Sequence, residues 1–178
     1  MSGRTALLAV DVQGDFLPGG ALAVRDGDAV VAPLLRAAAG VDLVVATRDW
    51  HPEHHVSFAE RGGPWPVHCL AGSAMARVHP DVDRVATVVV SKGTNPELDA
   101  YSGFDGTPLA AILRGAGVTR VLVGGLATDY CVRATALDAL REGFEVVVLR
   151  EAVRAVEVQP GDGERALAEV EAAGARVE

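Results

Sequence analysis

Groups that can take part in catalysis lie far apart in the sequence, and each follows a short apolar run. Asp11, Asp49 with His51, and Lys92 follow three such runs, and Cys131 begins a predicted helix after a fourth. A cysteine acts as a nucleophile when a nearby base accepts its proton and a cation stabilises the thiolate. A carboxylate, an ammonium group and a thiol therefore predict covalent catalysis, provided that the fold brings these residues together.

Lys92 is the only lysine among the 16 basic residues, and the others are arginines. Either a composition bias left one lysine by chance, or position 92 needs a property that arginine lacks. Arginine is planar and permanently charged, whereas the lysine ammonium is compact and its pKa shifts readily in a buried site. An ammonium next to a thiol also lowers the thiol pKa, so the second interpretation fits a catalytic role.

Cys131 follows a turn at 124–129 and begins a predicted helix over 130–142. The free N–H groups at a helix N-terminus stabilise anions, so we expect a lowered thiol pKa at this position. The same N–H groups can hold the oxyanion that forms during acyl transfer. A cysteine with apolar neighbours is more commonly a small core residue. Asp11 and Lys92 favour a nucleophile instead, because Asp11 can carry the proton that the thiol loses.

Asp49, His51 and His68 offer one carboxylate and two imidazoles within a single long loop. Such ligands suit zinc, and also iron or manganese, and they leave positions open for water. The alternative is that Asp49 caps the end of a strand and that the histidines are solvated. Three more residues nearby offer ligand atoms, and the sequence does not choose among them: His54, His55 and Glu60.

Short apolar runs alternate with stretches of helical spacing, which is typical of βαβ units on a parallel sheet. The predicted strands are 6–11, 42–47, 85–91, 120–126, 145–149 and 175–177. The predicted helices are 29–39, 108–115, 130–142 and 163–173, with C-cap glycines at Gly40, Gly117, Gly143 and Gly174. No linker or repeat divides residues 1–178. We therefore expect a single α/β domain with three αβα layers and a mostly parallel, roughly six-stranded, Rossmann-like sheet.

In open α/β sheets the site lies outside the carboxyl ends of the strands. The candidate groups all follow predicted strands, so we expect them at one edge of the sheet. Two long irregular loops, 48–72 and 93–107, should border this edge, because long loops in compact domains are usually functional. His79 is expected to lie in a turn, and Cys69 is expected to be buried and inert.

The chain of 178 residues has a formal net charge of −8 and no basic cluster, which argues against nucleic acid and anionic membranes as partners. No apolar run approaches the ~20 residues of a membrane helix, and the N-terminus lacks the layout of a secretory signal. Two cysteines do not make a disulfide framework, so we expect a cytoplasmic protein. The sequence leaves open whether the chain forms a homo-oligomer.

Five motifs in order along nearly the whole chain resemble the nicotinamidase group of the isochorismatase-like cysteine hydrolases. The motifs are Asp11-x-Gln13-x-Asp15-Phe16, Arg48-Asp49-Trp50-His51-Pro52, Trp65-Pro66-x-His68-Cys69, Lys92-Gly93 and Gly125-x-Ala127-Thr128-Asp129-Tyr130-Cys131-Val132. The resemblance implies hydrolysis of nicotinamide to nicotinate and ammonia in NAD salvage, and also of pyrazinamide, through a thioester. It implies a triad of Asp11, Lys92 and Cys131. It also implies a cis peptide bond between Leu126 and Ala127, and an oxyanion hole formed by the N–H groups of Ala127 and Cys131.

The same resemblance implies that Asp49, His51 and His68 hold one divalent metal ion, and we expect this ion to be zinc. The ion would orient the pyridine nitrogen of the substrate. It implies a pocket around a flat ring, lined by Phe16, Leu22, Trp65, Tyr101 and Tyr130. The alternative for these aromatic residues is that they anchor loops on the core. Two other functions stay open: a related hydrolase acting on another small amide or on isochorismate, and a catalytically silent binding protein on the same fold. Family members that cleave isochorismate typically lack the cysteine and the metal-binding histidines, and this chain has both.

Overall fold

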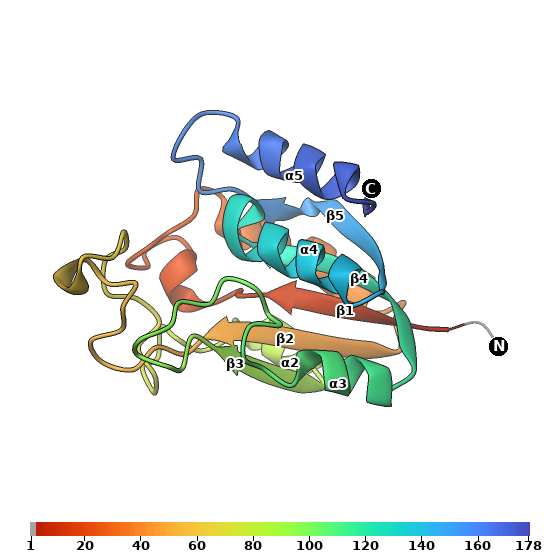
Figure 1. Ribbon diagram of the computed structural model, residues 1–178, viewed down its shortest axis with the longest axis horizontal. Helices are drawn as coiled ribbons and strands as arrows, with labels where there is room; N and C mark the ends of the chain where they lie inside the picture. The colour runs from red at the N-terminus through yellow and green to blue at the C-terminus, as the bar shows by residue number, and fades with distance from the viewer. Residues whose placement is uncertain (1–2) are drawn as a thin grey trace.

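The computed structural model describes residues 3–178 and contains six strands in one sheet (Figure 1). The strands are β1 (Arg4–Val10), β2 (Leu43–Asp49), β3 (Val88–Lys92), β4 (Val118–Leu126), β5 (Glu145–Arg154) and β6 (Arg176–Val177). Their order across the sheet is β3-β2-β1-β4-β5-β6, and every neighbouring pair is parallel. The prediction of an α/β fold with a mostly parallel, roughly six-stranded sheet is confirmed, and all the observed pairs are parallel.

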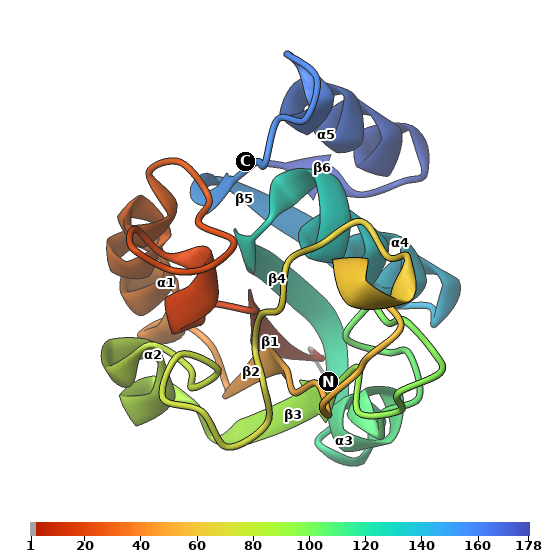
Figure 2. The same cartoon turned by 90° about the vertical axis from the view of Figure 1, so that its left-hand side faces the viewer.

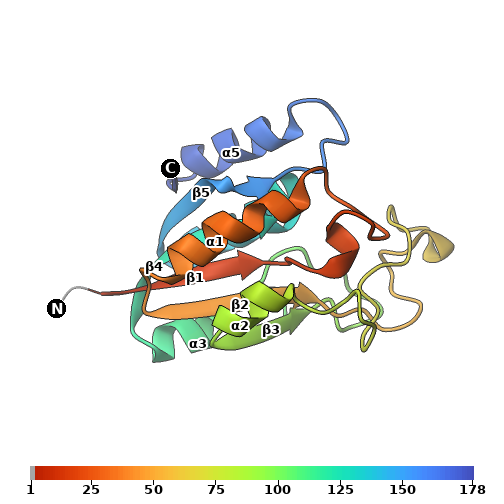
Figure 3. The ribbon, with the colours of Figure 1, turned by 180° about the vertical axis from the view of Figure 1, so that it is seen from behind.

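Helices cover both faces of this sheet and give the protein three layers. Within residues 3–178 the α-helices are α1 (Val31–Ala38), α2 (Pro80–Val85), α3 (Leu109–Gly115), α4 (Arg133–Arg141) and α5 (Asp162–Ala172). Helices α1 and α2 lie on one face, as the view from behind shows (Figure 3). Helices α3, α4 and α5 lie on the other face (Figures 1 and 2).

The sheet is buried on both faces, which explains why its strands are nearly continuous apolar runs. Successive side chains of β1 alternate between the faces. Leu8 and Val10 pack in the core that includes α3, α4 and α5, whereas Leu7 and Ala9 pack in the core that includes α1 and α2. Because β1 packs against both cores, the backbone position of Asp11, which directly follows β1, is fixed.

The segment around His79 differs from the prediction. Instead of an isolated turn, His79 is the N-cap of α2, and its Nδ1 accepts the N–H of Asp81 at 3.2 Å. Pro80 occupies the first helical position, where its missing N–H costs nothing. Helix α2 ends at Val85, so β3 begins at Val88, three residues later than predicted.

The helix that carries Cys131 also begins earlier than predicted. A π-helical turn over Thr128–Val132 precedes α4 and is continuous with it. Three of the four predicted glycine C-caps have the positive φ of such caps: Gly117, Gly143 and Gly174. Gly40 also follows the end of α1, as predicted, but it does not have a positive φ.

The carboxyl ends of the strands meet at one edge of the sheet, where the order of the strands reverses. Strands β2 and β3 lie on one side of β1, and β4, β5 and β6 lie on the other. The loops that follow β1 and β2 lie across this edge (Figure 2). Crevices at such reversal points are the usual ligand sites of open α/β sheets. No helix of residues 3–178 is long and apolar enough to cross a membrane.

Candidate active site and metal centre

The ends of four neighbouring strands deliver Asp11, Asp49, Lys92 and Cys131 to one buried place. Asp11 follows β1 directly, and Asp49 and Lys92 are the last residues of β2 and β3, where they pair across the sheet. Cys131 lies in the π-helical turn that follows β4. All four residues are buried, and the most exposed of them, Cys131, is 6% exposed.

The Lys92 ammonium is the centre of this group. Its Nζ lies 2.9 Å from Oδ2 of Asp11 and 2.5 Å from Oδ1 of Asp49. It donates to the carbonyl of Ala100 at 3.0 Å and to Sγ of Cys131 at 3.5 Å. A carboxylate oxygen of each aspartate and Sγ also lie within 4.8 Å of one another. The fold therefore brings the residues of the predicted triad together around a single cation.

Burial and charge pairing set the ionisation of the three charged groups. Burial alone would lower the pKa of Lys92, but the carboxylates of Asp11 and Asp49 raise that pKa well above its ordinary value. Burial alone would raise the pKa of Asp49, but Lys92 and His51 lower it below its ordinary value. For Asp11, burial outweighs the attraction of Lys92, and the pKa is raised. Asp11 is therefore the carboxylate that takes up a proton more readily.

The thiol of Cys131 differs from the prediction made from its position. Burial raises the pKa of Cys131, the Lys92 ammonium lowers it, and Asp11 raises it again, so that the pKa lies well above its ordinary value. The prediction of a lowered thiol pKa is therefore wrong, because burial and two nearby carboxylates outweigh the ammonium. The raised pKa favours the protonated thiol, and the carboxylate of Asp11 lies next to it.

A close approach of two backbones holds the Cys131 turn against β1. Gly125 has a φ of 121°, and a Cβ at this position would lie 2.1 Å from the carbonyl oxygen of Val10. Only glycine combines this φ with this contact. The peptide bond between Leu126 and Ala127 is cis, as the family resemblance implies. Ala127 is the N-cap of the turn that contains Cys131, so the two predicted oxyanion donors belong to one turn.

Asp49, His51 and His68 form a buried cluster in which one ligand atom of each lies within 4.8 Å of the others. Oδ2 of Asp49 lies 3.5 Å from Nε2 of His51 and 3.9 Å from Nε2 of His68. The two Nδ1 atoms contact the carbonyls of Gly93 and Pro66 at 2.9 and 2.8 Å. A ring nitrogen that bonds a carbonyl carries the proton, so in the neutral form of each ring the lone pair is on Nε2, which faces the cluster. This donor set fits a divalent ion such as zinc.

The additional histidines of the loop do not belong to the cluster. His55 is buried and stacks on His51 with ring centroids 4.1 Å apart. Its two nitrogens contact Oγ of Ser57 at 2.8 Å and a backbone carbonyl at 3.1 Å, so neither is free for a metal. His54 is exposed and pairs with Glu60 at 2.9 Å. Among residues 3–178, the cluster therefore offers three candidate ligands.

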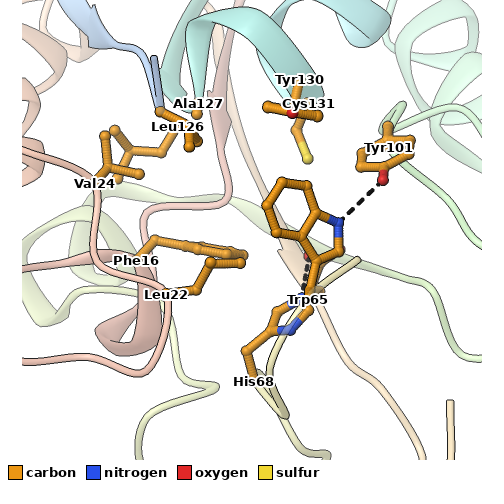
Figure 4. A pocket seen from close by; sticks show the side chains of 12 residues that line it. Phe16, Leu22, Val24, Trp65, His68, Tyr101, Leu126, Ala127, Tyr130 and Cys131 are labelled. Carbon is orange, nitrogen blue, oxygen red and sulfur yellow. Dashed lines mark hydrogen bonds and ion pairs between the residues drawn. The ribbon is translucent and has the colours of Figure 1, made fainter. Parts of the chain in front are cut away.

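A small apolar pocket opens beside Cys131 (Figure 4). The pocket is lined by Phe16, Leu22, Val24, Asp49, Trp65, His68, Tyr101, Leu126, Ala127, Tyr130, Cys131 and Val156. All the predicted pocket residues are among them. The rings of Trp65 and Tyr130 meet edge to face at 5.1 Å, and Nε1 of Trp65 donates to the hydroxyl of Tyr101 at 3.1 Å. These three aromatic side chains therefore contact one another and form one wall of the pocket.

Sequence reasoning missed the residues that support the site without facing the pocket. Thr47 lies inside β2 and donates to Asp11, and Gln13 binds the backbone of Asp49. Both side chains are fully buried. The available signal was a polar residue inside an apolar strand or within three residues of its end, because such a residue, when buried, must find a partner.

Comparison with known proteins places these features in one family. The family model of the isochorismatase domain matches residues 5–178. The nicotinamidase of Escherichia coli is 40% identical over an alignment of 196 positions, which covers 96% of this chain and 92% of that protein. The pyrazinamidase of Pyrococcus horikoshii, solved in complex with zinc, is 52% identical with a TM-score of 0.92 over 98% of both chains. A Leishmania protein (L. infantum), solved in complex with nicotinate, is 38% identical with a TM-score of 0.93 over 100% of this chain and 93% of that one. The chain belongs to the isochorismatase family.

Proposed function

We propose that the protein is a metal-dependent nicotinamidase, which converts nicotinamide and water to nicotinate and ammonia through a thioester on Cys131. The proposal rests on the composition of one pocket. The thiol of Cys131 and two residues of the metal cluster, Asp49 and His68, line the same small apolar cavity. A flat ring that carries a nitrogen and a carboxamide can meet both. The nicotinamidase and pyrazinamidase relatives support this choice of substrate.

The charge of the pocket favours a neutral amide over an anionic substrate. None of the described residues that line it is a lysine or an arginine. Asp49 is ionised, because Lys92 and His51 outweigh the effect of burial and lower its pKa. A substrate with carboxylates, such as isochorismate, would lack a cationic side chain to pair with, and a buried unpaired charge is costly.

The residues present fit a metal ion. Asp49, His51 and His68 would hold the ion. When bound, the ion would supply a Lewis acid that interacts with the ring nitrogen of the substrate directly or through water. Zinc suits the one carboxylate and two imidazoles, and the zinc complex of the P. horikoshii relative supports that identity; iron and manganese accept the same ligands.

The first half of the reaction forms the thioester. Asp11 accepts the proton of the Cys131 thiol as sulfur attacks the carboxamide carbon. The carbonyl oxygen becomes an oxyanion, and the N–H groups of Ala127 and Cys131 donate hydrogen bonds to it. The C–N bond then breaks, and Asp11 returns its proton to the leaving nitrogen, so that ammonia departs and the acyl group stays on sulfur. Lys92 stabilises the negative charge while it moves between Asp11 and Cys131.

The second half releases the product. Asp11, again ionised, accepts a proton from water as the water oxygen attacks the thioester carbon. The same N–H groups hold the second oxyanion. The C–S bond then breaks, and Asp11 returns the proton to the sulfur of Cys131. The acid product ionises to nicotinate, and the enzyme is restored.

We place this reaction in the cytoplasm, with nicotinamide as the small-molecule partner and pyrazinamide as a second substrate. The zinc-loaded protein should release ammonia from nicotinamide, a chelator should stop the release, and added zinc should restore it. Hydrolysis of another small amide in place of nicotinamide would contradict the substrate. Absence of hydrolysis for any small amide would instead favour a binding protein.

A further inference from the structure

Gln13 binds both main-chain polar groups of Asp49. Its side-chain Nε2 donates to the carbonyl of Asp49 at 2.8 Å and to the carbonyl of Ala76 at 2.7 Å. Its Oε1 accepts the N–H of Asp49 at 2.8 Å. The residue is fully buried, so no water competes for these bonds. A single amide group therefore joins the loop after β1 to the end of β2.

The position of Gln13 explains why a side chain is needed here. The paired register of β1 and β2 ends at Ala9 and Ala46, and Asp11 makes one further backbone bond, from its N–H to the carbonyl of Thr47 at 3.1 Å. Beyond this bond, residues 12–13 and 48–49 form no backbone hydrogen bond with one another. Buried N–H and C=O groups must still be paired. The side-chain amide of Gln13 forms hydrogen bonds with the N–H and C=O groups of Asp49, which a neighbouring strand backbone would otherwise form.

The orientation of Asp49 matters because both of its carboxylate oxygens are in use. Oδ1 lies 2.5 Å from Nζ of Lys92. Oδ2 faces the Nε2 atoms of His51 and His68 at 3.5 and 3.9 Å. A small rotation or shift of the backbone would move one oxygen away from its partner, since a metal ligand tolerates only a few tenths of an ångström.

We infer that Gln13 is a positioning residue of the metal centre, which fixes the backbone of Asp49 so that Oδ2 faces the two histidines. Gln13 does not line the pocket and contacts Asp49 through the backbone rather than through a ligand atom, so it acts on the metal centre through Asp49. The inference rests on the metal centre of the proposed function and not on its substrate, because zinc binding can be measured without nicotinamide.

Two substitutions test the inference, and a third controls for lost stability. Gln13→Glu keeps the length and an acceptor for the N–H of Asp49, but it removes the donor that binds two carbonyls. Gln13→Asn keeps the amide and shortens the side chain by one methylene. Thr135→Val removes another buried hydrogen bond, in which Oγ1 of Thr135 accepts the N–H of Gly103 at 2.9 Å. This control reports the effect of a general loss of stability.

The measurement is a titration of each zinc-loaded protein with a chromophoric chelator, with folding checked by circular dichroism and thermal unfolding of the same samples. We expect both Gln13 variants to bind zinc roughly 10- to 100-fold more weakly, as is usual when residues that orient metal ligands are changed. Thr135→Val should unfold at a lower temperature and keep the zinc affinity of the parent protein.

Parental zinc affinity in the folded Gln13 variants would overturn the inference, and so would an equal loss in Thr135→Val. If Gln13→Glu does not fold, Gln13→Asn provides the same comparison, and its zinc-induced rise in melting temperature gives a second readout. If the parent binds zinc, the Gln13 variants bind it weakly and none of them hydrolyses nicotinamide, the inference stands and the proposed function fails.

Discussion

The hydroxyl of Thr47 donates a 2.7 Å hydrogen bond to Oδ1 of Asp11, and both residues are fully buried. Oδ2 of the same carboxylate lies 2.9 Å from Nζ of Lys92, but within residues 3–178 it accepts no hydrogen bond of good geometry. The two oxygens therefore have different surroundings. Thr47 fixes Oδ1 and so orients the carboxylate, and we assign the proposed proton transfer to Oδ2.

Thr47→Val keeps the shape of the side chain and removes the hydroxyl. We expect kcat for nicotinamide to fall by roughly 10- to 100-fold, which corresponds to the loss of a ~1.5–3 kcal/mol hydrogen bond to a charged group. KM should change little, because Thr47 does not line the pocket. Thr47→Ser keeps the hydroxyl and should recover most of kcat. Steady-state kinetics of the two variants checks this, and a parental kcat in Thr47→Val would show that Asp11 functions without the bond.

Cys131→Ala should abolish hydrolysis and leave the fold intact, because the thiol is needed for the covalent step and its removal deletes one small buried atom. Cys69 provides the matched control. It is fully buried and does not line the pocket, and burial together with nearby carboxylates raises the pKa of Cys69. Cys69→Ala should therefore keep nearly all activity. Ammonia release and circular dichroism of both variants provide the comparison, and equal losses would indicate that both cysteines are structural.

Lys92→Arg should be nearly as damaging as Lys92→Ala. The ammonium is enclosed by Asp11, Asp49 and the carbonyl of Ala100, and a planar guanidinium is too large for this space. Lys92→Ala leaves two buried carboxylates without their cation, which costs about 3–5 kcal/mol of stability. Activity and thermal unfolding of both variants test this prediction. A fully active Lys92→Arg enzyme would mean that any positive charge suffices.

Gly93 and Gly106 have nearly the same φ, 62° and 64°, but different surroundings. A Cβ on Gly93 would lie 2.5 Å from Cε1 of His51, whereas a Cβ on Gly106 would have nothing within 4 Å. Both alanine variants carry the strain of a positive φ, but only Gly93→Ala displaces His51. We expect zinc affinity to fall about tenfold or more in Gly93→Ala and to hold in Gly106→Ala, as measured by chelator titration. Equal affinities would argue against His51 as a ligand.

Benzamide, in which carbon replaces the ring nitrogen, should be a far poorer substrate than nicotinamide. If the ion held by Asp49, His51 and His68 binds the ring nitrogen, benzamide leaves that contact unsatisfied. Enzymes discriminate strongly against a substrate that lacks a polar group for which the site is built. Removal of the ion with a chelator should impair nicotinamide hydrolysis in the same way, and zinc should restore it. Similar rates for the holoenzyme on both amides would leave the three residues as a structural site.

The alternation of apolar and helical stretches was enough to predict the sheet, because parallel strands buried on both faces need continuous apolar runs. It did not reveal α2, since six residues make less than two turns and show no helical period. The predicted end of β5, at residue 149, was five residues too early. Exposed Arg150 and Glu151 interrupt the apolar run, but the strand continues to Arg154.

The position of the candidate site followed from a general property of parallel sheets, whose carboxyl ends share one edge. This is why Asp11, Lys92 and Cys131 could be grouped before their distances were known. Gln13 and Thr47 could not be assigned, because their bonds depend on the register of two strands rather than on residue type. The pKa of Cys131 was predicted in the wrong direction for a related reason: its burial and its carboxylate neighbours are properties of the assembled core.

The delivery of one site residue from each of four strands also affects how the protein acquires activity. Lys92 contacts Cys131 across 39 positions of the chain and Asp49 across 43. The proposed base, Asp11, precedes Cys131 by 120 positions, so no short fragment contains both base and nucleophile. Contacts of this range form late, since distant segments must first be brought together. A folding intermediate with native helices and an incomplete sheet would be inactive, and ammonia release during refolding would report the final docking of the strands.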